Sequence, residues 1–380
     1  MTYLSVDELQ NTLAKNVFHY TKDSKKAAGR ALGTLVEIIS FYTLKSWGFE
    51  KYIAIEKPLQ EYMNSDIVHN IEYSLHPLMQ IESIDWSKKL LPITSTKLLK
   101  KSKAYRVLKP NTSIRSNHLL TSRSILRNAC TVCDTPNGFV NAYLDSVTKD
   151  RLHINLCSLY NHPFAIVECK RVGVEEGTKK GPQTIEKAKQ GAYVARTVSS
   201  LQKIRLNNGR IGGVIHLPNG SLYYKDYPIL LSEIIKSKKK EFLQNFVLTI
   251  GVISNHGNWF TSSNPNKELK VLAQSYDWLL FLTDKGLAQF INDLIQRPLP
   301  QYKPIKKAFL ESYSGKKGKN RFTKVQIALD ADIALQKYFK SNIQKINSWF
   351  NIITPKNKIL SHLWDELNIL TKKDWRRILK

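Results

Sequence analysis

Apolar and polar residues recur along this chain with two different periods, which predict its helices and strands. Apolar residues at helical spacing predict one amphipathic helix over Ser24–Trp47, with Gly48 as its terminating residue. Further helices are predicted at 184–204 and 284–295. Short β-favouring runs predict strands, and these cover Tyr52–Ile55, Asn70–Leu75, Arg151–Tyr160, Pro163–Lys170, Ile211–Leu217, Phe246–Ser254 and Tyr276–Leu282. Both element types together indicate an α/β fold.

Two of the predicted strands are separated only by Asn161 and His162. A two-residue loop between β-favouring runs is typical of an antiparallel hairpin. With this loop, Asn155 on the first strand lies opposite Glu168 on the second.

The second of these strands ends in a pair of opposite charges, Glu168 and Lys170. Side chains alternate between the faces of a strand, so both project to the same side. Placing two charges at the end of an otherwise apolar strand costs desolvation free energy, and proteins rarely do this for stability alone. Binding a divalent metal and activating a water beside it is an economical reason for such a pair.

The whole chain is strongly basic. It carries 58 Lys and Arg against 31 Asp and Glu, a formal net charge of +27 over 380 residues. This excess favours a polyanionic partner, because each neutralised phosphate releases a condensed counterion. Ribosomal and membrane-surface proteins are also basic. However, seven Trp, seventeen Tyr and 42% hydrophobic residues are typical of a folded globule rather than a charged tail.

Targeting signals and cysteine usage indicate the compartment. The first residues lack the basic start and apolar core of a secretory signal, and no apolar run is long enough to span a bilayer. Four cysteines are too sparse for a disulfide framework. We therefore expect a cytoplasmic protein with no membrane association.

Positive charge is concentrated in one segment. Between Ser87 and Cys133 there are eleven Lys or Arg and no acidic residue. Such imbalance indicates an interaction surface, with a merely solvated basic face as the alternative. We predict that a basic insertion at about 80–135 contacts DNA phosphates and base edges. Its candidate residues are Lys100, Lys101, Lys103, Arg106, Lys109, Arg115, Arg123 and Arg127.

Prolines at positions 298, 300 and 304 indicate a boundary near residue 300. We therefore expect two parts, a catalytic domain at 1–300 and a basic region with helical patterning at 301–380. Further candidates for DNA contact lie outside the basic insertion, and they are Arg171, Lys319 and Arg321.

The order of helix, hairpin with the charged pair, helix and buried strand resembles the PD-(D/E)XK nuclease superfamily, and within it the type II restriction endonucleases. The resemblance covers about 27–253, with interruptions. Glu168-Cys169-Lys170 matches the family's (D/E)-x-K element. Its place at the end of an apolar strand gives this short motif its weight, because such tripeptides also occur by chance.

Residues on the flanking helices add to the resemblance. Glu37 matches the acid often found on the first helix of the family. Gln190 and Tyr193 lie where many members carry a glutamine and an aromatic residue. For Glu37 and Gln190 the alternative is an ordinary polar residue on a helix surface.

The resemblance implies a PD-(D/E)XK core, in which helices flank a central mixed β-sheet, with the basic insertion and the C-terminal helical region attached. It also implies Mg²⁺-dependent hydrolysis of phosphodiester bonds, with Glu168 and a carboxylate at position 155 holding the metal. Lys170 would orient or deprotonate the attacking water. Glu37 would bind a second metal directly or through water, and Gln190 would contact the phosphate or the loop following Lys170. The expected partners are double-stranded DNA, a second subunit in a homodimer, and a cognate DNA methyltransferase, in a bacterial cytoplasm.

One position departs from the family pattern. The family requires an Asp on the strand preceding the (D/E)-x-K strand, whereas the predicted hairpin places Asn155 there. An amide oxygen offers a hard cation no charge. Three interpretations follow: an inactivated variant in which Asn replaces Asp, a shifted register in which Asp145 or Asp150 supplies the carboxylate, or a natural chain that tolerates Asn.

Other functions and sites compete with this interpretation. A structure-specific or recombination nuclease of the same fold is one rival, and a non-catalytic DNA-binding protein with a decayed nuclease site is another, which Asn155 favours. Cys130 and Cys133 have the spacing of half a zinc site. No second pair follows nearby in the sequence, so two thiols without a metal are the simpler interpretation.

Overall fold

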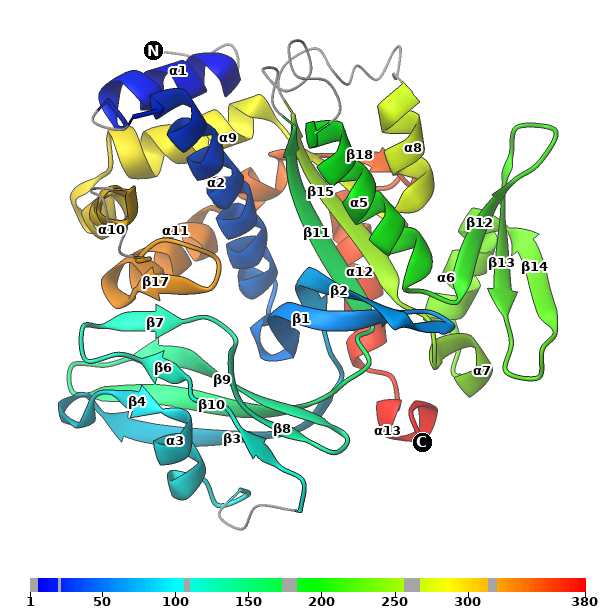
Figure 1. Ribbon diagram of the computed structural model, residues 1–380, viewed down its shortest axis with the longest axis horizontal. Coiled ribbons are helices and arrows are strands. Elements are labelled where there is room, and N and C mark those ends of the chain that lie inside the picture. The colour runs from blue at the N-terminus through cyan, green and yellow to red at the C-terminus, as the bar shows by residue number, and fades with distance from the viewer. Residues whose placement is uncertain (1–5, 20–21, 106–109, 173–182, 256–266, 314–319) are drawn as a thin grey trace. The chain divides into compact units, whose positions relative to one another are not determined.

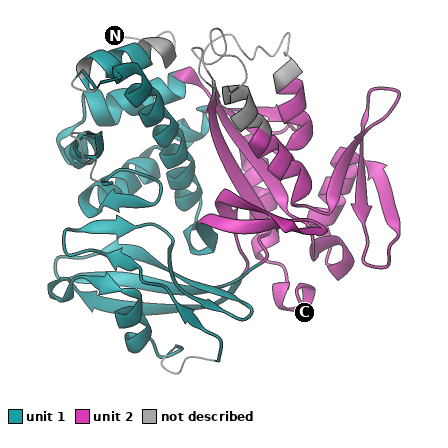
Figure 2. Ribbon diagram, viewed as in Figure 1, with its two compact units in different colours: residues 1–55, 78–161, 285–349 teal, residues 56–77, 162–284, 350–380 magenta. Residues whose placement is uncertain are grey.

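The computed structural model describes the chain except for residues 1–5, 20–21, 106–109, 173–182, 256–266 and 314–319 (Figure 1). The chain forms two compact units that alternate along the sequence (Figure 2). Unit 1 comprises residues 1–55, 78–161 and 285–349, and unit 2 comprises residues 56–77, 162–284 and 350–380. Each unit is therefore assembled from three stretches of chain, and the expected boundary at residue 300 falls inside unit 1.

Unit 2 is built around a six-stranded sheet with the strand order β1-β2-β11-β15-β16-β18. Its strands are β1 (Ile53–Glu61), β2 (Asn64–Leu75), β11 (Ala165–Val172), β15 (Leu248–Asn255), β16 (Trp278–Leu282) and β18 (Phe350–Thr354). β11 is antiparallel to β2 but parallel to β15, and β16 extends the parallel part before the antiparallel β18. The central strands are almost continuously buried, as expected for parallel strands that are covered on both faces.

Helices cover both faces of this sheet (Figure 1). The helices of unit 2 are α5 (Gln183–Thr197), α6 (Tyr227–Lys236), α7 (Lys240–Leu243), α8 (Lys267–Ser275), α12 (Leu360–Thr371) and α13 (Trp375–Ile378). On one face, Leu279 of β16 packs with Ala192 of α5. The preceding residue, Trp278, points to the other face, where its indole donates a hydrogen bond to Glu366 of α12 at 2.7 Å. The prediction of an α/β fold with helices flanking a central mixed sheet is confirmed.

A smaller antiparallel sheet follows α5 in the chain. It consists of β12 (Leu201–Arg205), β13 (Ile211–His216) and β14 (Leu222–Asp226). Its two turns contain Gly209 and Gly220, which adopt φ angles of 78° and 80°. Glycine suits these positions because it enters the left-handed region without steric cost.

Unit 1 contains two antiparallel sheets and a group of helices. One sheet has the order β3-β10-β9-β8-β5, and the other has the order β17-β7-β6-β4. The strands are β3 (Leu78–Ser87), β4 (Ile93–Thr94), β5 (Ser113–Ile114), β6 (His118–Leu120), β7 (Ile125–Arg127), β8 (Cys130–Thr135), β9 (Gly138–Val147), β10 (Arg151–Tyr160) and β17 (Gln326–Ala328). The helices are α1 (Val6–Asn16), α2 (Ser24–Ser46), α3 (Ser95–Lys101), α9 (Asp284–Ile291), α10 (Lys303–Tyr313) and α11 (Leu329–Asn347).

Several elements agree with the sequence patterns and others do not. The amphipathic helix is α2, and the strand predicted at Arg151–Tyr160 is β10. The helix predicted at 184–204 is too long, because α5 ends at Thr197 and β12 begins at Leu201. The region at 301–380 is mainly helical, as expected, but it also contributes β17 and β18.

The predicted hairpin around Asn161–His162 is wrong. β10 pairs with β3 and β9 in unit 1, whereas β11 pairs with β2 and β15 in unit 2. The two residues therefore connect different sheets. A short loop permits a hairpin, but the partners of a strand are decided by long-range burial, which the local pattern does not contain.

Candidate active site

Two buried glutamates meet where β2 and β11 separate. The ladder between these strands ends at the pair formed by Tyr73 and Val167. Just beyond it, the backbone N–H of Glu72 donates to Glu168 Oε1 at 3.1 Å, and the backbone N–H of Cys169 donates to Glu72 Oε2 at 2.5 Å. Each carboxylate thus accepts a hydrogen bond from a buried backbone N–H of the other strand. The two bonds hold both side chains at the point where the strands separate, the fork between β2 and β11.

Lys170 completes this group. Its Nζ lies 3.1 Å from Glu168 Oε2, as expected for side chains two residues apart on one strand. The Lys170 side chain keeps 28% of its exposure, whereas that of Glu168 keeps 6%. The ammonium is therefore the more accessible partner of this ion pair.

Small residues bring α5 and Tyr276 close to the charged group. A Cβ at Gly191 of α5 would lie 2.7 Å from Tyr276 Oη and 3.4 Å from Lys170 Cε. A Cβ at Gly251, which pairs with Glu168 across β11 and β15, would lie 2.8 Å from the Tyr276 ring. A larger residue at either position would clash with Tyr276, so this packing requires glycine at both. Gly191, Gly251 and Tyr276 thus form a closely packed wall beside Glu168 and Lys170.

The electrostatics of the group reflect its burial. Burial raises the pKa of Glu168 above its ordinary value, with Lys170 acting against this shift and Glu72 adding to it. Burial alone would lower the pKa of Lys170, but Glu168 and Glu72 raise it, and their effect prevails. Lys170 therefore carries its proton beside the two carboxyl groups.

The donor set is chemically suited to magnesium. Mg²⁺ prefers carboxylate oxygens and is usually held by one or two of them, with waters and substrate phosphate filling the other positions. Glu72 and Glu168 supply two carboxylates at one place. The described parts of the chain contain no cluster of three or more His, Cys, Asp or Glu side chains arranged to hold a metal. Two carboxylates therefore suit a metal that takes its remaining ligands from water and substrate phosphate, as Mg²⁺ does.

Asn155 does not lie opposite Glu168. It belongs to β10 of unit 1, where its Oδ1 accepts a hydrogen bond from Ser83 at 2.6 Å and its Nδ2 donates to Tyr143 at 2.9 Å. With both functions of the amide satisfied, Asn155 is explained as a structural residue. The expectation that position 155 holds the metal depended on the hairpin, and that pairing is absent.

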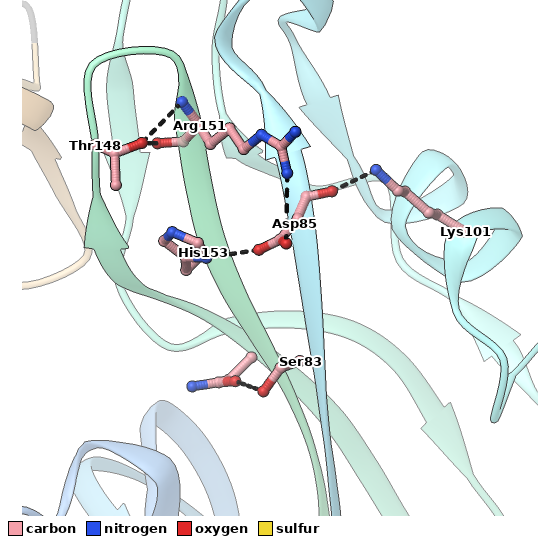
Figure 3. A network of polar contacts seen from close by, with 7 residues as sticks. Ser83, Asp85, Lys101, Thr148, Arg151 and His153 are labelled. Atoms are coloured by element: carbon pink, nitrogen blue, oxygen red, sulfur yellow. Dashed lines mark hydrogen bonds and ion pairs between the residues drawn. The ribbon is translucent and has the colours of Figure 1, made fainter.

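The residues near Asn155 form a polar network of their own (Figure 3). His153 Nδ1 lies 2.5 Å from Asp85 Oδ1, and Arg151 contacts the same carboxylate at 3.9 Å. Lys101 donates to the backbone carbonyl of Asp85. These contacts join β3, β10 and α3 across the surface of unit 1.

The other predicted site residues lie in different settings. Glu37 lies on α2 of unit 1, where its Oε1 is 3.6 Å from Lys324 Nζ. Gln190 is exposed on α5, one residue before Gly191, and so stays near the charged group in unit 2. Arg171 follows Lys170 on β11 and therefore projects from the opposite face of the sheet.

The predicted DNA-contacting residues are partly engaged within the protein. Arg115 forms an ion pair with Asp134 at 2.5 Å, and Arg321 forms one with Glu311 at 2.6 Å. The exposed members are Lys100, Lys101, Lys103, Arg115 and Arg123, while Arg127 is half-buried. Three candidates, Arg106, Lys109 and Lys319, lie outside the described residues.

Cys130 and Cys133 are buried on β8. Burial raises the pKa of Cys130 to about 12 and that of Cys133 to about 11. Zinc binds the thiolate form, which such surroundings disfavour. The thiols are therefore explained by packing in the five-stranded sheet.

Sequence reasoning missed Glu72, although it predicted the strand that carries it. The signal was present: Glu72 is the one acid within the buried stretch 71–75. The hairpin prediction took the partner of β11 from the strand immediately before it in the chain. The actual partner is β2, which residues 78–161 of unit 1 separate from β11 in the sequence.

Comparison of the chain with protein-family models, curated proteins and solved structures found no match.

Proposed function

We propose that the protein is a Mg²⁺-dependent DNA endonuclease with a site of the PD-(D/E)XK type. The observation that carries this proposal is the group formed by Glu72, Glu168 and Lys170, two carboxylates and an ammonium held at the fork between β2 and β11. The order of elements that suggested the resemblance is kept only in part, because the charged pair lies not in a hairpin with β10 but on β11 beside β2. α2, β1, β2, β11, α5 and β15 still succeed one another in this order, with β3–β10 of unit 1 inserted between β2 and β11.

The chemistry follows from the positions of these side chains. Glu72 and Glu168 would hold the metal, which polarises a phosphoryl oxygen and lowers the pKa of a bound water. The Lys170 ammonium offsets negative charge that develops on the phosphate in the transition state. The wall formed by Gly191, Gly251 and Tyr276 keeps the carboxylates and Lys170 in one geometry.

The first test is cleavage of plasmid DNA in Mg²⁺ by the intact chain and its Glu72→Gln variant. We expect the variant to lose activity by more than about 100-fold, since even indirect metal partners are worth about 10–100-fold. Calorimetric titration with Mg²⁺ alone should show weaker metal binding in the same variant. Asp66→Asn is the matched control, because Asp66 is exposed on the same strand about 20 Å away.

A second variant distinguishes this site from the one expected from the hairpin. Asn155→Asp should not raise the activity, because Glu72 already supplies the second carboxylate. Activity that appears only in Asn155→Asp, or that survives in Glu72→Gln, would place the site elsewhere. Glu72 also weakens the case for a decayed or inactivated nuclease, which depended on the amide at position 155.

The pattern of cleavage separates the remaining classes. Discrete fragments support a site-specific restriction endonuclease, for which a homodimer and a cognate methyltransferase are the proposed partners. A smear or loss from the ends supports a structure-specific or recombination nuclease. DNA binding without cleavage, with Glu168 and Lys170 intact, would support the non-catalytic alternative.

A further inference from the structure

Unit 2 contains a pocket of about 390 Å³ among the β12–β14 sheet, α6, α8, α12 and the segment after β18. Its apolar lining is supplied by Ile211, Tyr227, Pro228, Leu231, Ala273 and Pro355. Sites for small organic ligands have volumes of about 300–1,000 Å³ and combine apolar walls with a few polar groups. The pocket has the size and the wall chemistry of such a site.

The charged residues of the pocket leave an excess of positive charge. The lining contains the cations Lys203, Arg210, Lys356 and Lys358 and the acids Asp226 and Glu366. Arg210 pairs with Asp226 at 2.5 Å, and Lys358 pairs with Glu366 at 3.3 Å. Within the described part of the chain, Lys203 and Lys356 make no ion pair. Two cations are therefore left to attract an anion.

Lys203 is held in a fixed position at the wall of the pocket. Its Nζ donates to the backbone carbonyl of Tyr276 at 2.5 Å and lies 4.3 Å from the centroid of the Tyr227 ring. Burial lowers the pKa of Lys203 to about 8, and Asp277 partly opposes this shift. An ammonium has three donors, so a partly desolvated Lys203 retains hydrogen-bonding capacity for a ligand.

We propose that this pocket binds a small organic phosphate with a flat ring, of the class of a nucleoside monophosphate. The phosphate lies against Lys203 and Lys356, and the ring lies against Tyr227 and the neighbouring prolines. Inorganic phosphate would leave the apolar walls uncovered, and a neutral ring would leave the excess charge unbalanced. The proposal does not depend on nuclease activity, because no residue of the charged group on β2 and β11 lines the pocket.

The test is calorimetric titration of the full chain with deoxyadenosine 5′-monophosphate as the probe, in buffer containing EDTA to exclude metal-dependent binding. Deoxyadenosine and inorganic phosphate are titrated separately. We expect the nucleotide to bind more tightly than either part by about tenfold or more, since charged hydrogen bonds and ring burial both contribute. Absence of nucleotide binding, or equal binding of inorganic phosphate, would overturn the proposal.

Two variants and two matched controls locate the binding. Lys356→Gln removes an excess cation from an exposed position, and Ser232→Trp fills the pocket from the partly exposed side of α6. Each should weaken nucleotide binding by about tenfold or more. Lys236→Gln and Ile229→Trp introduce the same residues at exposed positions of α6 outside the pocket and should bind normally. Thermal melting verifies that each variant is folded, and unchanged binding in both pocket variants would refute the assignment.

Discussion

Gly191 is the residue at which helix α5 passes closest to the charged group of the candidate site. We predict that Gly191→Ala lowers the free energy of unfolding by about 1–3 kcal/mol, because the added methyl group would lie 2.7 Å from Tyr276 Oη. The displacement would also reach Lys170, whose Cε is 3.4 Å from the same position. Urea denaturation measures the first effect. DNA cleavage measures the second, for which we expect a loss of up to about 100-fold.

Gly33 is the matched control for this substitution. It lies within α2, and a Cβ there would have no heavy atom within 4 Å. Gly33→Ala should therefore leave cleavage unchanged and stabilise the protein by about 0.5–1 kcal/mol, because alanine loses less backbone entropy in a helix. Equal stability changes in the two variants would show that the close approach at Gly191 is absent.

His162, which follows β10 in the chain, makes stability depend on pH. Burial lowers its pKa to about 4, while its hydrogen bond to the carbonyl of Phe246 acts in the opposite direction. The unfolded residue has a pKa of about 6.5, so between these values the unfolded state binds a proton that the folded state does not. The contribution of His162 to stability is therefore fully present above a pH of about 6.5, and the free energy of unfolding falls by at most about 3 kcal/mol as the pH drops to about 4.

Urea denaturation at several pH values checks this prediction. The stability difference between the intact chain and His162→Gln should shrink as the pH falls through this range. The exposed His118, replaced in the same way, is the control and should leave the acid dependence in place. A difference that does not change with pH would contradict the prediction.

The local sequence pattern predicted two residues of the candidate site, Glu168 and Lys170, but not the third, Glu72. Glu168 and Lys170 could be singled out because two charges at the end of an apolar strand are visible in the sequence alone. Their partner, Glu72, is brought to them by strand pairing across a long separation in sequence. Asn155 was chosen in its place only because it is near in the chain.

Whole elements show the same difference between what the local sequence pattern predicts and what long-range strand pairing decides. Helix α2 and strand β10 were predicted well because their burial patterns repeat with the period of a single element. The sheet to which β10 belongs was not predictable in this way. The segment 161–162 resembles a hairpin loop, yet the strands on either side pair in different sheets, and that choice depends on which apolar faces they bury.

Asp332 joins helices α11 and α2 within unit 1. Its buried carboxylate accepts hydrogen bonds from Tyr42 and Gln336, both at 2.6 Å, and lies 3.7 Å from Lys45 Nζ. We predict that Asp332→Ala lowers the free energy of unfolding by about 1–3 kcal/mol, because it leaves the buried Tyr42 hydroxyl without this acceptor, whereas Lys45 keeps Glu50 at 2.5 Å. Urea denaturation followed by circular dichroism measures the change.

Asp330 provides the comparison on the same helix. It is exposed in the first turn of α11, so Asp330→Ala should cost less than about 1 kcal/mol, the usual size of a helix-dipole contact. Similar losses in the two variants would mean that the buried contacts between α11 and α2 contribute little to stability.

The net charge of the whole molecule overstates the charge available for DNA. Arg115 and Arg321 form ion pairs with acids, whereas Lys100 and Lys103, exposed on or just after α3, form none within the described part of the chain. Composition alone gave +27 without distinguishing these cases. Among the described residues, the predicted DNA-contacting surface is therefore best supported at the exposed members of the basic segment that have no acidic partner.

DNA affinity should depend steeply on salt if this surface holds the duplex. For about 6–10 phosphate contacts, affinity falls by about 10³–10⁵ between about 50 and about 200 mM salt. Fluorescence anisotropy in EDTA measures binding without cleavage. The double variant Lys100→Gln and Lys103→Gln should reduce the slope of log affinity against log salt by about 2, because each lost phosphate contact removes about 0.9. Lys236→Gln with Lys240→Gln changes the net charge equally on exposed positions of unit 2. A slope that falls equally in both double variants would show that DNA responds to the total charge of the molecule and not to this surface.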